Sequence, residues 1–562
     1  MKKNFSRIFF SALLVWCFFA PFDSVAQNKE GGRISGNLAS NGNFFFRDSL
    51  IGAVGTPQYD RQLFGAETWL NLNYSNWGFD FGLRFDMFNN SNLLNPRSSF
   101  TDEGIGRWYI RKKIQNLDIT GGYIYDQIGS GIIFRAYEER PLLIDNALFG
   151  ARLAYDLTPD WKVKVFTGRM KQQFGSYNSV IKGGSIEGFF AVGDSTKPVT
   201  FSPGIGVINR TLDDETMEQL VGALSTYTPD DSIGAKYNVF AYSFFNTLSF
   251  GGFSWFFEGA YKTNEVIYDP FAVKNNWNGE ETFGKFVFRD GSLIYTTLSY
   301  AGSGLGITGE YKRTENFSLR ASPFLRIEKL NDGLMNFLPP MTRVNTYRLT
   351  ARYNAATQEI GEQAFQLDIK YALNKKWKFN VNYSDIHNLS DTKLYQEVFT
   401  EIQYKHEKKW QILGGVQLQQ YNQDIFENKP LVPMVKTVTP YFDFLYKLDR
   451  KRALRFEGQY MSTEQDYGSW AFALLEYSIA PNWTFTASDM YNIQPGKNSP
   501  VDSETGEKLK LHYPRFDVYY THKSNRFSLS YIKQVEGVVC SGGVCRLEPA
   551  FHGVRLTVNS TF

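Results

Sequence analysis

Residues 365–384 have the sequence FQLDIKYALNKKWKFNVNYS, and this stretch decides the fold. Apolar side chains occupy alternate positions on both sides of a short polar turn: Phe365, Leu367, Ile369 and Tyr371, then Trp377, Phe379, Val381 and Tyr383. Side chains on a β-strand point to opposite faces in turn, so each half is a strand with one apolar and one polar face. The same alternation recurs at 83–87 and 347–353.

The turns between such strands carry a repeated aromatic pair. A Tyr before the turn is followed six positions later by a Trp in four places: Tyr155 and Trp161, Tyr371 and Trp377, Tyr404 and Trp410, Tyr477 and Trp483. A soluble β-sandwich shows the same alternation, and ordinary cross-strand pairing also joins aromatic residues. Neither explains one spacing at successive turns, whereas an aromatic girdle at a membrane boundary does.

Longer connections alternate with these short turns, at 89–103, 128–146, 210–236, 264–289, 422–434, 494–511 and 537–546. Counting strands with that parity gives about 26, including 316–328 and 342–354 in the weakest stretch, with an error of about two. We therefore predict an all-β fold, a single large antiparallel transmembrane β-barrel of about 24–26 strands.

Composition agrees with a barrel. Aromatic residues make up 17% of the 562 residues, yet mean hydropathy is −0.34. After the N-terminus no apolar run reaches the length of about 20 residues that a transmembrane helix needs. The net charge of +3 gives no indication of a nucleic-acid partner.

The N-terminus has the layout of a secretory signal peptide. Lys2, Lys3 and Arg7 precede the apolar run 8–19, and Ser24-Val25-Ala26 provides small residues for cleavage. A lipoprotein signal that uses Cys17 is the alternative, but Trp16 is too bulky before a lipidated cysteine. We expect residues 1–26 to be removed and residues 27–562 to form the barrel.

The C-terminus matches a closing strand. Val554, Leu556, Val558, Ser560 and Phe562 share one face. A last strand that ends in Phe resembles the assembly signal read by the barrel-insertion machinery, so we expect that machinery, outer-membrane lipid and lipopolysaccharide as partners. The expected location is the cell outer membrane.

Loop residues are the first candidates for function. The first strand starts close to the cleavage site, so we expect no plug domain, and the lumen of a wide barrel must hold water, folded-in loops or a partner. Gly129 and Gly131 permit a sharp bend in the segment 127–146. Its charged residues make a candidate lumen constriction: Arg135, Glu138, Glu139, Arg140 and Asp145. Two alternatives remain open, ion pairs that brace the wall and a solvent-exposed loop.

Other candidate sites are weaker. Cys540 and Cys545 flank a short loop and indicate a disulfide in an oxidising compartment, with a metal site as the weaker alternative. The acidic residues Asp213, Asp214, Glu215, Glu218, Asp230 and Asp231 form an outer loop, and a solvated face is favoured over a calcium or lipopolysaccharide site.

Enzyme motifs are sparse. The histidines are dispersed, and Asp385 with His387 is the nearest approach to a catalytic pair. We predict no enzyme activity, no cofactor and no metal site.

Two further motifs carry a resemblance. They are Gly122 to Gly131, continuing to Arg140 and Asn146, and Cys540 to Arg546 before the last strand. Together they resemble a family of Bacteroidota outer-membrane barrels of unsettled function. The resemblance implies location and fold, and it transfers no active site.

The predicted function is a channel or transporter for polar solutes, passive or gated by its own loops, with a lumen-folded loop near 128–146. The alternative is a structural or assembly barrel that docks a partner protein in secretion or surface-protein handling. A barrel-embedded hydrolase is the third possibility.

Overall fold

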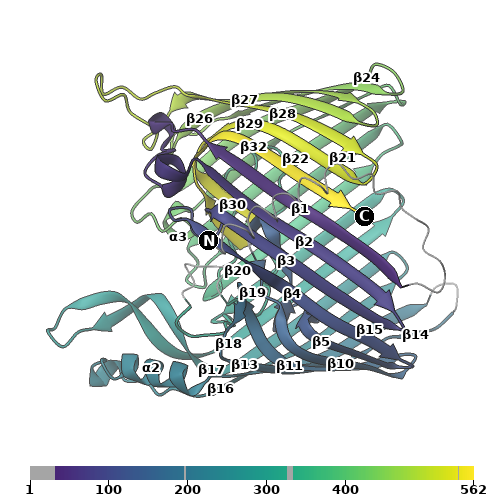
Figure 1. The fold of residues 1–562 in the computed structure, drawn as a ribbon, viewed down its shortest axis with the longest axis vertical. Helices are drawn as coiled ribbons and strands as arrows, with labels where there is room; N and C mark the ends of the chain where they lie inside the picture. The colour runs from purple at the N-terminus through teal and green to yellow at the C-terminus, as the bar shows by residue number, and fades with distance from the viewer. Residues whose placement is uncertain (1–31, 143, 195–197, 326–332, 542–543) are drawn as a thin grey trace, which may run out of the picture.

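Alternating strands close into a barrel in the computed structural model (Figure 1), which describes residues 32–142, 144–194, 198–325, 333–541 and 544–562. Within these residues, 26 strand segments form one antiparallel sheet. Two of them are short pieces beside longer strands, β12 (Gly175–Ser176) and β14 (Phe190–Val192). The remaining 24 strands of the described chain form the wall, within the predicted range.

The first half of the wall consists of β1 (Arg33–Phe45), β2 (Phe64–Asn76), β3 (Phe79–Ser91), β4 (Phe100–Ile114), β5 (Leu117–Ile124), β10 (Leu148–Thr158), β11 (Trp161–Gln172), β13 (Val180–Gly188), β15 (Val199–Thr211), β16 (Asn238–Phe250), β17 (Phe253–Asn275) and β18 (Glu281–Gly302). The second half consists of β19 (Leu305–Glu315), β20 (Gly361–Ala372), β21 (Trp377–His387), β22 (Lys393–His406), β23 (Trp410–Tyr421), β24 (Val435–Lys447), β25 (Arg452–Met461), β26 (Gly468–Ile479), β27 (Trp483–Pro495), β28 (His512–His522), β29 (Asn525–Gln534) and β32 (Phe551–Thr561).

The last strand closes the sheet against the first. β1 pairs with β32 from Asn37 opposite Thr561 to Phe45 opposite Gly553. Beyond that ladder, the Gly36 N–H donates to the Phe562 carbonyl at 2.8 Å, and the Phe562 N–H donates back at 3.0 Å. Closure leaves neither strand with an unpaired edge, which a membrane-spanning sheet requires. The predicted closing strand is confirmed, and the role of Phe562 as an assembly signal stays a prediction.

The two faces of the wall differ as the alternation predicts. On β24, Thr437, Thr439 and Tyr441 are buried, while Val438 is 47% and Phe442 41% exposed. The exposed apolar face therefore points outward and the buried face points into the barrel. An outward apolar band is what contact with lipid requires.

Aromatic side chains gather where the short turns lie, which we call the turn side. Neighbouring rings are in contact across the strands: Trp377 with Tyr404 at 4.6 Å, Tyr404 with Trp410 at 5.3 Å, and Trp483 with Tyr520 at 4.6 Å. Trp377 and Trp483 are exposed on the outer face. The predicted girdle is confirmed as an arrangement of rings.

The opposite end, the loop side, carries the long connections (Figure 1). The segment 264–289, expected as a loop, is mostly strand, because β17 and β18 continue beyond the barrel as a long hairpin. The helix α2 (Asp214–Leu224) packs on this hairpin through Met217, Leu220 and Leu224 against Val266. Shorter elements on this side are η1 (Ser49–Ile51), η2 (Gln58–Gln62), η4 (Pro229–Asp231), α3 (Gln423–Phe426), β30 (Gly537–Ser541) and β31 (Val544–Glu548).

The strands predicted at 316–328 and 342–354 are wrong. The described residues of both ranges form turns and irregular backbone, apart from one isolated bridge between Arg320 and Leu334. Backbone bonds from Ala351 to Tyr347 (3.0 Å) and from Arg352 to Leu349 (3.3 Å) coil the second range locally. Without these two strands, the β18–β19 turn falls on the turn side like the other short turns.

The expected absence of a plug domain is not confirmed. The described residues of the connection between β19 and β20, 316–325 and 333–360, enter the barrel from the loop side, and we call this connection the long lumen segment. The described residues of 125–147, between β5 and β10, enter beside it, and we call this connection the short lumen segment. Inward-facing wall residues are buried beneath them on the loop side, whereas Asp443 and Leu445 nearer the turn side stay partly exposed. The filled half of the lumen is therefore the loop-side half.

No helix in the described part of the chain combines the length and apolar character needed to cross a membrane.

Candidate functional site

The short lumen segment folds as two small hairpins. β6 (Asp126–Ile128) pairs with β7 (Phe134–Ala136), and β8 (Glu138–Glu139) pairs with β9 (Ile144–Asp145), with η3 (Arg140–Leu142) at the second bend. Gly129 and Gly131 have φ of 55° and 99°, so the predicted bend is confirmed. A Cβ at Gly129 would lie 2.8 Å from both Phe245 and Glu258, so the wall also requires glycine there.

Apolar side chains anchor this segment to the inner wall. Ile128, Ile132, Ile133 and Phe134 are fully buried. The Phe134 ring stacks on Phe166 of β11 at 4.5 Å. The same cluster includes residues of the long lumen segment, namely Phe317, Leu319, Ala321, Met335 and Leu338. Burial of this much apolar surface opposes displacement of the segment into water.

Hydrogen bonds join the two lumen segments into one body. The Arg135 N–H donates to the Met335 carbonyl at 2.9 Å, and the Asn336 side-chain amide donates to the Ile132 carbonyl at 3.0 Å. The Asn146 amide donates to both the Leu334 carbonyl (2.8 Å) and the Arg135 carbonyl (3.0 Å). The two connections therefore occupy the lumen as a unit.

Wall side chains satisfy the backbone of the long lumen segment. Lys262 donates to the Ser318 carbonyl at 2.9 Å, and Arg210 donates to the Arg320 carbonyl at 2.9 Å. Farther along the wall, in β23 and β25, Gln417 donates to the Thr350 carbonyl at 3.0 Å, Gln419 donates to the Tyr353 carbonyl at 2.7 Å, and Gln459 accepts from the Leu349 N–H at 2.7 Å. Irregular backbone is stable inside a barrel only when its polar groups find such partners.

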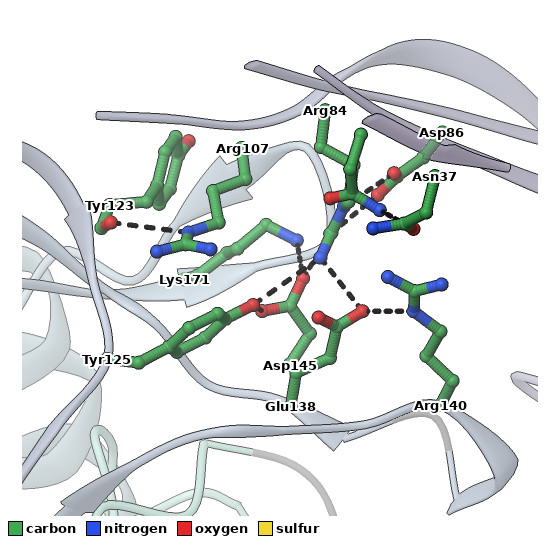
Figure 2. A network of polar contacts seen from close by, with 11 residues as sticks. Asn37, Arg84, Asp86, Arg107, Tyr123, Tyr125, Glu138, Arg140, Asp145 and Lys171 are labelled. Carbon is green, nitrogen blue, oxygen red and sulfur yellow. Dashed lines mark hydrogen bonds and ion pairs between the residues drawn. The ribbon is translucent and has the colours of Figure 1, made fainter. Parts of the chain in front are cut away.

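A charge network ties the short segment to β3 and β11 (Figure 2). Arg84 of β3 has a side chain only 2% exposed, and it pairs with Asp86 at 2.7 Å, Asp145 at 2.5 Å and Glu138 at 3.0 Å. Lys171 of β11 also pairs with Asp145, and Arg140 pairs with Glu138 at 2.6 Å. Three cations meet three carboxylates, so the network is neutral as a whole.

Asp145 is the junction of this network. It also accepts a hydrogen bond from the Tyr125 hydroxyl at 2.7 Å. Burial alone would raise the pKa of Asp145, but the charges of Lys171 and Arg84 outweigh it and hold that pKa below its ordinary value of 3.8. The carboxylate is therefore ionised across the neutral pH range, and the ion pairs persist there.

The structure separates the five predicted constriction residues. Glu138, Arg140 and Asp145 belong to the network. The Arg135 guanidinium lies instead over the rings of Tyr137 (4.5 Å) and Phe337 (4.2 Å). The backbone of Glu139 in β8 pairs with that of Ile144 in β9. Their role as a pore constriction stays a prediction.

Sequence reasoning missed the wall partners Arg84, Asp86 and Lys171, and it missed the long lumen segment altogether. The alternation along β3 could have identified Arg84 and Asp86, because both lie on the inward face, opposite to Leu83 and Phe85. No comparable signal marks 316–360, since its alternation imitates a strand.

The remaining candidates have structural surroundings. Asp213 caps α2 by accepting from the Thr216 N–H at 3.0 Å, and Asp231 pairs with Lys285 at 2.5 Å. The His387 ring lies 3.4 Å from Asp385 and 3.0 Å from Asp391. In the described residues, no group of three or more His, Cys, Asp or Glu is placed to hold a metal ion.

Cys540 and Cys545 lie opposite each other in the backbone pairing of the β30–β31 hairpin. Antiparallel pairing brings these two positions together. The predicted disulfide concerns side chains outside the described part of the structure.

The closed sheet, its apolar outer face and its packed polar interior define a β-barrel of the outer-membrane type. The chain belongs to DUF6029, a family of unknown function whose profile matches residues 1–562.

Three solved structures match this chain at low sequence identity. The P pilus usher (PapC) translocation pore matches at 10% identity over 94% of this chain and 99% of that chain, with a TM-score of 0.41. A ferric enterobactin receptor (PfeA) mutant from Pseudomonas aeruginosa matches at 8% identity over 95% and 82%, with a TM-score of 0.40. OccAB3 from Acinetobacter baumannii matches at 11% identity over 69% and 93%, with a TM-score of 0.32. No curated protein sequence matches this chain.

Proposed function

We propose that this protein is an outer-membrane channel or transporter for polar solutes, closed in its resting state by its own two lumen segments. The observation that carries the proposal is the division of the lumen. Its loop-side half is filled by the described residues of the two lumen segments, and its turn-side half keeps partly exposed inward-facing residues. A barrel this wide is a conduit unless something fills it, and here the filling belongs to the chain itself.

The attachment of the filling supports gating over free diffusion. Buried ion pairs and side-chain-to-backbone hydrogen bonds hold both segments to the wall. Each bond to a charged group stabilises by about 1.5–3 kcal/mol, and leaving such a group buried and unpaired is costly. Opening therefore needs a ligand or partner that replaces several of these contacts.

Single-channel recording of the refolded mature chain in planar bilayers tests this proposal. We expect long closed periods with rare conductance steps, because the filled half of the lumen must rearrange before ions pass. Addition of urea below the unfolding range should raise the frequency of the steps. Silence under every condition, including removal of the long lumen segment, would contradict a channel.

A second function, docking of a partner protein, is favoured by the tip of the β17–β18 hairpin. Trp277 is 72% and Phe283 79% exposed there, and Phe271 of the same hairpin is 56% exposed. Exposed aromatic clusters of this kind mark protein interfaces. Stoichiometric capture of a partner by the intact barrel, lost when the tip is truncated, would favour this function.

We also propose that the chain is exported and that its two remaining cysteines are oxidised. The predicted signal peptide, residues 1–26, lies outside the described residues. Insertion machinery, lipid and lipopolysaccharide are the partners that a barrel in the outer membrane would meet.

The mature chain should contain a disulfide between Cys540 and Cys545. Both positions face each other in one hairpin, and the compartment is oxidising. Mass spectrometry of the unreduced protein is expected to show no alkylated cysteine, and reduction should expose two sites. Alkylation of either cysteine without reductant would contradict the pairing.

A further inference from the structure

Two adjoining cavities lie between the long lumen segment and the inner wall of β26–β29. The larger, of about 450 Å³, is lined by Arg348 of the segment and by wall residues that include Arg515, Asp517 and Arg526. The smaller, of about 230 Å³, is lined by Arg348 together with Arg343, Arg352 and Glu548. Arg348, Met490 and Gln534 line both cavities, so Arg348 stands at their junction.

Most charges around the larger cavity are already paired. Arg515 binds Asp517 with two nitrogens, at 2.9–3.0 Å. Lys533 pairs with Asp48 at 2.8 Å, and Glu476 lies 4.0 Å from Arg455. These groups contribute little net charge to the space between them.

Two guanidinium groups are left over. Arg348 and Arg526 are both exposed to the larger cavity, and in the described part of the chain neither forms an ion pair. Arg526 lies over the Tyr519 ring at 4.7 Å. The surrounding protein and the charge of Arg352 lower the pKa of Arg348, and only Glu548 opposes them. A guanidinium so placed gains from an anion that restores its lost solvation and balances its charge.

The smaller cavity also has more positive than negative charge around it. Its three arginines face one carboxylate, Glu548. Arg352 also forms an ion pair with Asp466 at 4.0 Å, and the Arg343 guanidinium lies over the Phe399 ring at 3.3 Å. Arg343 Nη1 is buried without a hydrogen-bond partner among the described residues. The cavities together therefore hold an excess of positive charge and unfilled hydrogen-bond donors.

We propose that these cavities bind a small oxyanion solute, a carboxylate or a phosphate, with Arg348 as the principal ligand and Arg526 as the second. The planar guanidinium presents paired N–H donors that match two oxygens of such a group. Thr484, Thr486 and Ser488 of β27 line the same space and supply neutral donors. This inference rests on the proposed function, because it names the class of solute that the lumen would accept.

Calorimetric titration of the intact refolded chain in detergent, with inorganic phosphate and separately with succinate at constant ionic strength, tests the site. We expect at least one probe to bind, and Arg348→Gln to weaken its binding by about tenfold or more, since a charge-assisted pair is lost. Arg526→Gln should weaken it less. Arg97→Gln, at an exposed loop arginine, is the matched control and should bind as the parent does.

Absence of binding by both probes, or equal binding by the parent and Arg348→Gln, would overturn the site. Loss of binding in Arg97→Gln as well would also overturn it, since that pattern reflects bulk charge. The titration needs no current, so a silent barrel that binds phosphate through Arg348 refutes the channel and keeps the site. A conducting barrel that binds neither probe refutes the site and keeps the channel.

Discussion

Removal of residues 316–360 is expected to raise the single-channel conductance of the barrel by about tenfold or more, because the lumen of a barrel this wide is open once its filling is gone. Glu315 and Gly361 face each other in the β19–β20 ladder. A two-residue Asn-Gly turn can therefore replace the whole segment without changing the strand register. Planar-bilayer recording gives the step size, and liposome swelling with neutral sugars gives the size of the opening.

Two controls make this deletion interpretable. Heat-dependent migration on denaturing gels shows whether the variant still folds as a barrel, since the deletion removes apolar contacts as well as the obstruction. Excision of the exposed turn 502–507, which connects the bridged residues Val501 and Lys508, removes loop residues without opening the lumen. A folded variant without 316–360 whose steps are no larger than those of the 502–507 variant would show that this segment does not close the pore.

Arg84→Ala is expected to give the largest loss of stability among single substitutions in the lumen, about 3–5 kcal/mol. The Arg84 side chain is almost fully buried and forms ion pairs with Asp86, Glu138 and Asp145 at the same time. Its removal leaves carboxylates inside the barrel with too few cations. The short lumen segment should detach first, because two of its ion pairs, those of Glu138 and Asp145, depend on this one residue.

Hydrogen exchange measured by mass spectrometry locates this effect. Residues 134–146 of Arg84→Ala should exchange faster than in the parent, while the strands β20–β24 keep their protection. Channel recordings should show more frequent brief openings. Arg452→Ala, which breaks an exposed ion pair with Asp449 in a turn, is the control and should change neither readout measurably.

The double variant Arg84→Met with Asp86→Asn separates charge from packing. It removes one cation and one carboxylate, and it leaves Lys171 with Asp145 and Arg140 with Glu138. Balanced replacement of a buried pair is far less costly than loss of one partner. The double variant should therefore be more stable than Arg84→Ala. If it is equally unstable, the ion pairs do not hold the segment.

The strands of the barrel wall can be predicted from the local sequence alone. The alternation at 377–383, the Tyr and Trp at successive turns and the strand that ends at Phe562 all depend on which face of one strand meets lipid. That property has a period of two residues, and it needs no knowledge of distant segments. Strands, girdle and closure were therefore predictable, to within two strands.

The content of the lumen was decided by tertiary structure alone. An inward-facing polar residue such as Gln417 looks the same in sequence whether it meets water or the Thr350 carbonyl, and Arg84 gives no sign that Asp145, far along the chain, is its partner. Residues 342–354 show the period of a strand, yet they coil inside the barrel, because wall side chains satisfy their backbone there and no neighbouring strand is free to pair. Hydrogen bonds between distant segments stabilise the coiled backbone over a strand, and they can form only once the barrel has closed around this segment.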